Sequence, residues 1–164
     1  ILCIYKMANI LFIGVGTMGY PMATNLIKNK HNLNLYDPYA LKKNIKNLKS
    51  LGCIKIESLK NIPNNLDFVI TMLPTGKEVK EVTIGNHGIV NYTKDNFIYI
   101  DMSTILPKDS IEISQQLKKK GISMLDAPVA RLVQNAIDGT LLILVGGEKE
   151  EYALSKSMLS CIGK

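Results

Sequence analysis

Three glycines near the start of the chain have the spacing of a phosphate-binding turn. Gly14, Gly16 and Gly19 form the pattern Gly-x-Gly-x-x-Gly directly after the apolar run Ile10–Ile13. The first glycine permits a tight turn, the second lets a phosphate approach the backbone, and the third lets a helix pack closely on the preceding strand. The amides at the start of that helix then face the phosphate. The complete turn consists of Gly14, Val15, Gly16, Thr17, Met18 and Gly19.

An acidic residue stands where a ribose-binding carboxylate is expected. Asp37 ends the run Leu33–Tyr36, 18 residues after the last glycine of the motif, and a carboxylate at that place accepts hydrogen bonds from the ribose of a dinucleotide. We therefore interpret the turn as a dinucleotide site rather than a chance glycine-rich turn. Asp37 favours NAD, because it would repel the 2′-phosphate of NADP and the next residue is Pro38 rather than Arg. The nearby Lys42 and Lys43 leave NADP open.

Two further groups of residues follow predicted strands. Leu73 and Pro74 end one apolar run, and Ser103 and Thr104 follow the next. Ligands of parallel α/β sheets bind outside the carboxyl ends of the strands, so we expect both groups to lie beside the cofactor. From spacing alone, an N-cap for the helix that begins near Pro107 explains Ser103 and Thr104 equally well.

One arginine stands out among lysines. Arg131 is the only arginine among the 20 cationic side chains, and it follows the segment Asp126–Ala130. Its planar, permanently charged guanidinium suits bidentate binding of a carboxylate, sulfonate or phosphate. The alternative is an exposed loop arginine without a ligand.

Apolar runs alternate with helical patterns along the chain. This alternation predicts an α/β fold of Rossmann type, with a doubly wound, mostly parallel sheet and helices on both faces. Gly121 is expected to end one helix. The predicted strands are Ile10–Ile13, Leu33–Tyr36, Ile54–Ile56, Asp67–Leu73, Phe97–Asp101, Ile122–Asp126 and Leu141–Val145. The predicted helices are 18–30, 40–50, 108–120 and 149–159.

Composition excludes several classes of protein. The 164 residues are 46% apolar, enough for one globular domain and too apolar for a disordered chain. No apolar run reaches the roughly 18 to 20 residues of a membrane helix. The net charge of +6 comes almost entirely from dispersed lysines, and the chain lacks Trp. These features favour a solvated surface over nucleic-acid binding. The three cysteines form no CxxC pair, so we expect no metal site, no disulfide framework and a reducing, cytoplasmic location.

Five blocks of sequence together resemble the β-hydroxyacid dehydrogenase family, which includes 3-hydroxyisobutyrate dehydrogenase. The resemblance extends over residues 7–164 and implies an NAD(P)-dependent oxidoreductase that interconverts a small anionic β-hydroxy acid and its aldehyde. It also implies that Thr17, Met18, Asp37, Leu73 and Thr104 contact the cofactor. The matching blocks are Phe12–Leu26, Thr71–Pro74, Asp101–Thr104, Asp126–Val129 and Gly139–Leu141.

One departure from the family concerns the substrate. Where members commonly carry Ser-Gly-Gly, this chain has Ala130, Arg131 and Leu132. This resembles the 3-sulfolactaldehyde reductase branch, in which an arginine at the matching position holds the anionic group, so the substrate class includes hydroxyalkyl sulfonates. We expect Ser103 and Arg131 to bind substrate.

The second departure concerns domain organisation. We expect Ile1–Lys6 to be an extension and residues 7–164 to form one NAD(P)-binding domain. The resemblance implies a further all-helical domain, carrying the catalytic lysine, beyond Lys164. We therefore assign no catalytic residue and expect this chain alone to be inactive, with the full-length form a homo-oligomer. The alternative is a non-catalytic dinucleotide-binding module.

Overall fold

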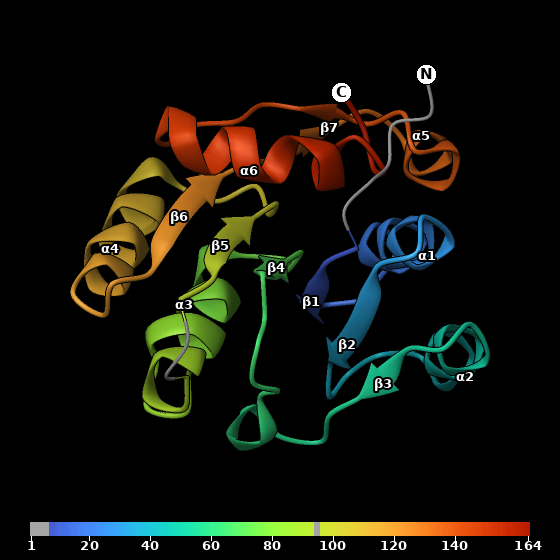
Figure 1. The fold of residues 1–164 in the computed structure, drawn as a ribbon, viewed down its shortest axis with the longest axis horizontal. Coiled ribbons are helices and arrows are strands. Elements are labelled where there is room, and N and C mark those ends of the chain that lie inside the picture. The colour runs from blue at the N-terminus through green and yellow to red at the C-terminus, as the bar shows by residue number, and fades with distance from the viewer. Residues whose placement is uncertain (1–6, 94–95) are drawn as a thin grey trace.

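One parallel sheet organises the chain. The computed structural model describes residues 7–93 and 96–164, so the predicted extension over residues 1–6 lies outside the described part. Six strands follow the order β3-β2-β1-β4-β5-β6, and every neighbouring pair is parallel (Figure 1). The predicted doubly wound Rossmann-type fold is confirmed. The strands are β1 (Asn9–Ile13), β2 (Asn32–Tyr36), β3 (Ile54–Lys55), β4 (Phe68–Thr71), β5 (Ile98–Asp101) and β6 (Ser123–Asp126).

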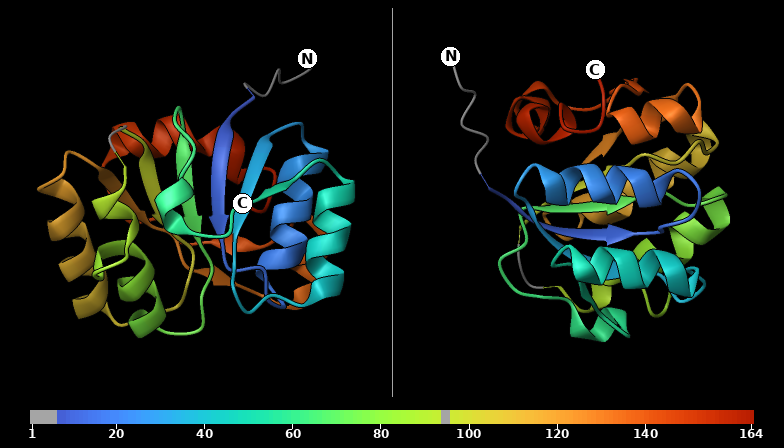
Figure 2. Two further views of the ribbon diagram at one scale, coloured as in Figure 1. Left: turned by 90° about the horizontal axis from the view of Figure 1, so that it is seen from below. Right: turned by 90° about the vertical axis from the view of Figure 1, so that its right-hand side faces the viewer.

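Alternating side chains of the strands build a core on each face of the sheet. On β1, Phe12 packs in the cluster that contains Met22 of α1, whereas Leu11 packs in the cluster that contains Val79 of α3. Figure 2 shows α1 and α2 on one side of the sheet and α3 and α4 on the other. The helices are α1 (Gly19–Lys28), α2 (Lys42–Ser50), α3 (Gly76–Ile84), α4 (Pro107–Lys118), α5 (Val133–Asp138) and α6 (Lys149–Leu159), with short 3-10 turns at Leu59–Asn61 and Ile89–Asn91.

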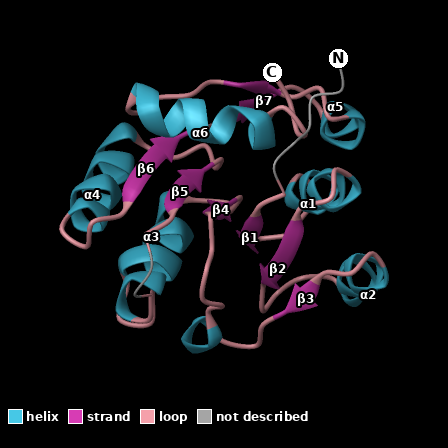
Figure 3. Ribbon diagram, viewed as in Figure 1, coloured by secondary structure: helices cyan, strands magenta, loops and turns pink. Residues whose placement is uncertain are grey.

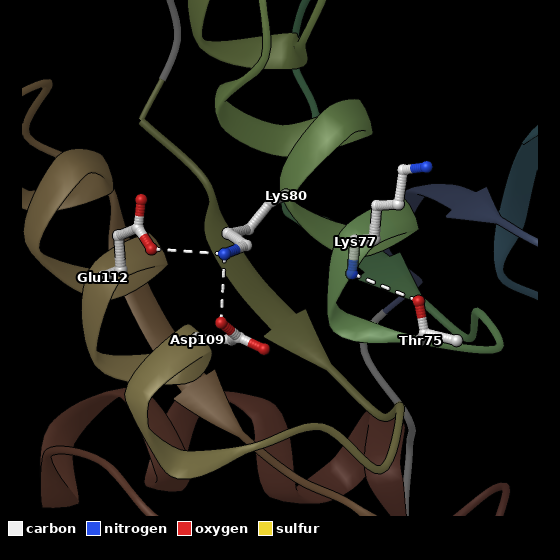
Figure 4. A network of polar contacts seen from close by, with 5 residues as sticks. All are labelled: Thr75, Lys77, Lys80, Asp109 and Glu112. Carbon is white, nitrogen blue, oxygen red and sulfur yellow. Dashed lines mark hydrogen bonds and ion pairs between the residues drawn. The ribbon is translucent and has the colours of Figure 1, made fainter.

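Polar contacts hold α3 against α4. The Lys80 ammonium lies 3.0 Å from Asp109 Oδ1 and 3.3 Å from Glu112 Oε2 (Figure 4). At the start of α3, the Thr75 hydroxyl accepts a hydrogen bond of 3.2 Å from the backbone N–H of Lys77. These contacts fix the helix that begins directly after the loop at the end of β4.

The last part of the chain differs from the prediction. The strand expected over Leu141–Val145 is reduced to β8 (Leu142–Ile143), which pairs antiparallel with β7 (Val129–Ala130) in a separate two-stranded sheet. Gly146 also exchanges two backbone hydrogen bonds, 2.7 and 2.9 Å long, with Asp126 at the end of β6. The segment therefore folds back across the end of the main sheet instead of extending it.

Helix boundaries agree with the prediction to within two residues, as helix ends generally do. Gly121 has φ 74°, and the N–H of Ile122 bonds to Leu117 O at 3.1 Å, so the predicted helix end after α4 is confirmed. Sequence analysis missed α3, which has nine residues, and α5, which has six. Among the helices of the described residues, none has the length and apolar content needed to span a membrane.

A buried histidine joins the start of β1 to the end of the chain. His31 Nδ1 accepts a hydrogen bond from the N–H of Ala8 at 3.2 Å, and its Nε2 lies 3.6 Å from Cys161 Sγ (both residues are buried). Because Nδ1 is an acceptor, the folded protein holds the neutral ring. Burial lowers the pKa of His31 below 6.5, and the opposing effect of Asp67 is smaller.

We expect His31 to contribute a part of the free energy of unfolding that is fully present above pH 6.5 and is lost as the pH drops from there through its lowered pKa. In that range the unfolded chain binds a proton that the folded chain does not. His31→Asn should remove this acid-dependent part, whereas the same change at the exposed His87 should leave it intact. Urea unfolding at a series of pH values measures both, and equal slopes for wild type and His31→Asn would contradict the prediction.

Candidate functional site

The glycine turn connects β1 to α1, and its three glycines have different surroundings. Gly14 has φ 95°, and a Cβ on it would collide with the carbonyl oxygen of Met72. A Cβ on Gly19 would collide with the carbonyl oxygen of Gly14. A Cβ on Gly16, by contrast, would meet no atom within 4 Å. Packing therefore requires two of the glycines, whereas the third faces open space at the start of α1.

The N-terminus of α1 is free of side-chain caps within the described part of the chain. Its N-cap residue, Met18, makes no capping hydrogen bond, and the first turn contains no acidic residue. In α3 the corresponding place is capped by the Thr75 side chain. The amides and dipole at the start of α1 are consequently available to a negatively charged group next to Gly16.

Asp37 lies directly against the glycine turn. Its Oδ2 accepts a hydrogen bond of 2.8 Å from the N–H of Val15, and its Oδ1 accepts one of 2.8 Å from the N–H of Tyr39. The Asn44 side chain of α2 donates to the carbonyl of Val15 at 3.1 Å. Each carboxylate oxygen keeps a second lone pair that can accept from a sugar hydroxyl. Sequence reasoning found Asp37 but missed Tyr39 and Asn44, which carry no motif of their own.

The loops after β4 and β5 are joined by a buried hydrogen bond. The Ser103 hydroxyl is fully buried and accepts from the N–H of Leu73 at 2.9 Å. Pro74 and Thr104, the next residues along each loop, are exposed. The N-cap of α4 is Leu106, which makes no side-chain capping bond, so the N-cap alternative for Ser103 and Thr104 is wrong.

A carboxyl group that sequence reasoning passed over lies beneath these loops. Asp101 ends β5 with no exposed surface, and its Oδ1 accepts from the Thr71 hydroxyl at 2.8 Å and from the N–H of Ser103 at 3.0 Å. Its Oδ2 has no hydrogen-bond partner among the described residues. Burial raises the pKa of Asp101, and neighbouring Asp126 acts in the same direction. The sequence signal that could have identified Asp101 is an acidic residue at the end of an otherwise apolar strand.

Arg131 has an unusual backbone conformation. Its φ of 90° lies in the left-handed region that favours glycine, which costs a side-chain-bearing residue about 1–3 kcal/mol. The side chain is exposed, and within the described residues its one hydrogen bond runs from Nη1 to the carbonyl of Thr140 at 2.9 Å. Most N–H groups of the guanidinium thus remain available to an anion.

Because the strands of the main sheet are parallel, their carboxyl ends, which most of the predicted residues follow in the sequence, lie along one edge of the sheet. Strands β1 and β4 lie side by side at its centre (Figure 3). The order changes direction between β1 and β4, so a crevice is expected there. Gly16 and Asp37 lie on the β2 side of this point, and Leu73 and Thr104 follow the strands on the other side. The structure brings Asp37 to the glycine turn and Ser103 to Leu73, whereas Arg131 bonds to neither pair. Their ligand contacts stay predictions.

Known proteins resemble nearly the whole chain. Residues 9–164 match the family described as the NAD binding domain of 6-phosphogluconate dehydrogenase. The 3-sulfolactaldehyde reductase of Escherichia coli (strain K12) is 38% identical over 157 residues, which cover 96% of this chain and 52% of that protein. The mitochondrial 3-hydroxyisobutyrate dehydrogenase of Mus musculus is 38% identical over 152 residues, which cover 93% of this chain and 45% of that protein.

A solved structure agrees with these relatives. The 3-hydroxyisobutyrate dehydrogenase of Mycobacterium tuberculosis, solved with L-serine, has a TM-score of 0.88 and 30% identity, and the match covers 96% of this chain and 53% of that one. The chain spans about half the length of these relatives. The predicted resemblance is confirmed: the chain belongs to the family described as the NAD binding domain of 6-phosphogluconate dehydrogenase, and it is similar to the corresponding half of 3-sulfolactaldehyde reductase and of 3-hydroxyisobutyrate dehydrogenases.

Proposed function

We propose that this domain binds the cofactor of an oxidoreductase that interconverts a small anionic β-hydroxy acid, or hydroxyalkyl sulfonate, and its aldehyde. The observation that carries the proposal is the bond between Asp37 and the N–H of Val15, which holds a carboxylate beside an uncapped helix N-terminus. The identity to 3-sulfolactaldehyde reductase supports the substrate class. The bound cofactor supplies the hydride chemistry.

In this proposal, different residues at the carboxyl ends of the strands bind different parts of the cofactor. The diphosphate lies over Gly16 and the amides of Thr17 and Met18, with Gly14, Val15 and Gly19 shaping the turn. Asp37 accepts from the adenosine ribose and favours NAD over NADP. The nicotinamide half lies across Leu73, Pro74 and Thr104. Open space at Gly16 supports this placement, since a phosphate needs close access to the backbone there.

The same similarity supports our proposals for the substrate and the partners. Arg131 binds the anionic group, and Ser103 stays a predicted substrate contact although its hydroxyl is buried. We propose no nucleic-acid partner. The catalytic group belongs to the half of the relatives that this chain does not span, and the full-length form is a homo-oligomer in a reducing, cytoplasmic compartment. The described cysteines, Cys53 and Cys161, are buried free thiols, as that compartment favours.

Asp37→Ala should weaken NADH binding by about tenfold or more, because it removes a charged acceptor from the ribose. NADPH should be affected less, since the same change removes a charge that repels its phosphate. Glu57→Ala, which removes an exposed carboxylate from the loop after β3, is the matched control and should bind NADH as wild type does. Titration calorimetry measures all three proteins. Well-folded wild type that binds neither coenzyme would disprove the proposed function.

Gly16→Ala and Gly19→Ala should separate binding from folding. The methyl group of Gly16→Ala has room in the free protein but occupies the space required by the diphosphate, so thermal stability should persist while NADH binding is lost. Gly19→Ala places its methyl group against the Gly14 carbonyl, so its melting temperature should fall by several degrees even without ligand. Thermal melts with and without NADH test the pair; unimpaired NADH binding by Gly16→Ala would contradict the placement of the diphosphate.

Arg131→Ala should leave NADH affinity unchanged and abolish the protection that we expect 2,3-dihydroxypropane-1-sulfonate, the alcohol of 3-sulfolactaldehyde, to give to the NADH-saturated protein in thermal melts. Arg131→Gly should lose the same protection, yet melt at a higher temperature than Arg131→Ala, because glycine adopts φ 90° without strain. Equal protection of the wild type and both variants would show that the guanidinium does not bind the anion.

A further inference from the structure

A chain of buried hydrogen bonds runs from the sheet to the loop after β4. Asp101 Oδ1 accepts from the N–H of Ser103 at 3.0 Å, and the Ser103 hydroxyl accepts from the N–H of Leu73 at 2.9 Å. Asp101 and Ser103 have no exposed surface. This first arm of the network therefore fixes the loop after β4 relative to the loop after β5.

A second arm starts from the same oxygen of Asp101 and leads to α3. The Thr71 hydroxyl donates to Asp101 Oδ1 at 2.8 Å and lies 2.9 Å from the Tyr99 hydroxyl, which lies 2.7 Å from the Thr83 hydroxyl. Thr83 in turn donates to the carbonyl of Val79 inside α3 at 2.6 Å. This arm connects the sheet to a helix and ends inside α3, away from the two loops.

We propose that Ser103, held by Asp101, is a positioning residue for the nicotinamide half of the cofactor. This inference rests on the proposed function. Strands β4 and β5 lie on the opposite side of β1 from β2 and Asp37, so a dinucleotide that crosses the glycine turn places its second half over the loops after β4 and β5. The buried hydroxyl acts through Leu73, whose backbone it fixes beneath that half.

The fully buried Asp101 side chain acts in this arrangement through one acceptor oxygen. Burial, with Asp126 nearby, raises its pKa, and Oδ1 alone receives the two hydrogen bonds from Thr71 and Ser103. An amide of the same shape keeps that acceptor. The sequence Asp-x-Ser that begins at the last residue of β5 therefore supports the loop after β4 through one side-chain acceptor and one hydroxyl.

Two single-hydroxyl deletions test the proposal on the 164-residue chain. Ser103→Ala removes the bond to Leu73, and Thr83→Val removes the far end of the second arm; both side chains are fully buried. Each variant is titrated with NADH and with ADP, which carries the adenosine half and the diphosphate only. We expect Ser103→Ala to weaken NADH about tenfold and to bind ADP as wild type does. Thr83→Val should lower the melting temperature and leave both affinities unchanged.

A general loss of stability would weaken the binding of both NADH and ADP. An equal loss of NADH and ADP affinity in Ser103→Ala therefore overturns the inference. An unchanged NADH affinity in this variant overturns it as well. Asp101→Asn should retain NADH affinity, whereas Asp101→Leu should lose NADH affinity and keep ADP affinity, as Ser103→Ala does. Weaker NADH binding by Asp101→Asn than by Asp101→Leu would also overturn the inference. Wild type that binds ADP and NADH while Ser103→Ala matches Thr83→Val refutes only this inference. Wild type that binds neither ligand refutes the proposed function.

Discussion

The hydrogen bond from the N–H of Val15 to Asp37 is the interaction on which the site depends. It joins the turn after β1 to the end of β2, two elements that are neighbours in the sheet but separated by the whole of α1. A carboxylate in that position is oriented before any ligand arrives, because the N–H of Tyr39 holds its second oxygen. Binding then requires little rearrangement, and preorganisation of this kind is what converts contacts into affinity.

Close packing beneath the turn supplies the rest of that preorganisation. Gly14 lies against the carbonyl of Met72 at the end of β4, and Gly19 lies against Gly14 itself. The turn is thus enclosed by its neighbours on the protein side and open at Gly16 on the other. One short segment therefore joins β1, β4 and α1, which explains why a side chain has no room at Gly14 or Gly19.

Much of this arrangement could be predicted from sequence because its causes are local. The apolar runs, the glycine spacing and Asp37 each reflect a requirement of a few neighbouring residues, and the parallel fold follows from their alternation. The partners of the Ser103 hydroxyl could not be predicted in this way, because Leu73 lies on another strand end, 30 residues away. The left-handed backbone of Arg131, which directly follows β7, was equally hidden, because arginine is not a residue type that indicates a positive φ. Short α5 shows too few helical turns for a periodic signal.

The fold-back of the segment after β7 has a consequence for association. Gly146 forms backbone hydrogen bonds with Asp126 on the side of β6 that faces away from β5. It therefore occupies part of the backbone edge that β6 would otherwise offer to a strand from another molecule. At the far end, β3 contains only two residues and is a poor template for the same kind of pairing. Two copies of this chain are thereby discouraged from joining their sheets into one continuous ladder.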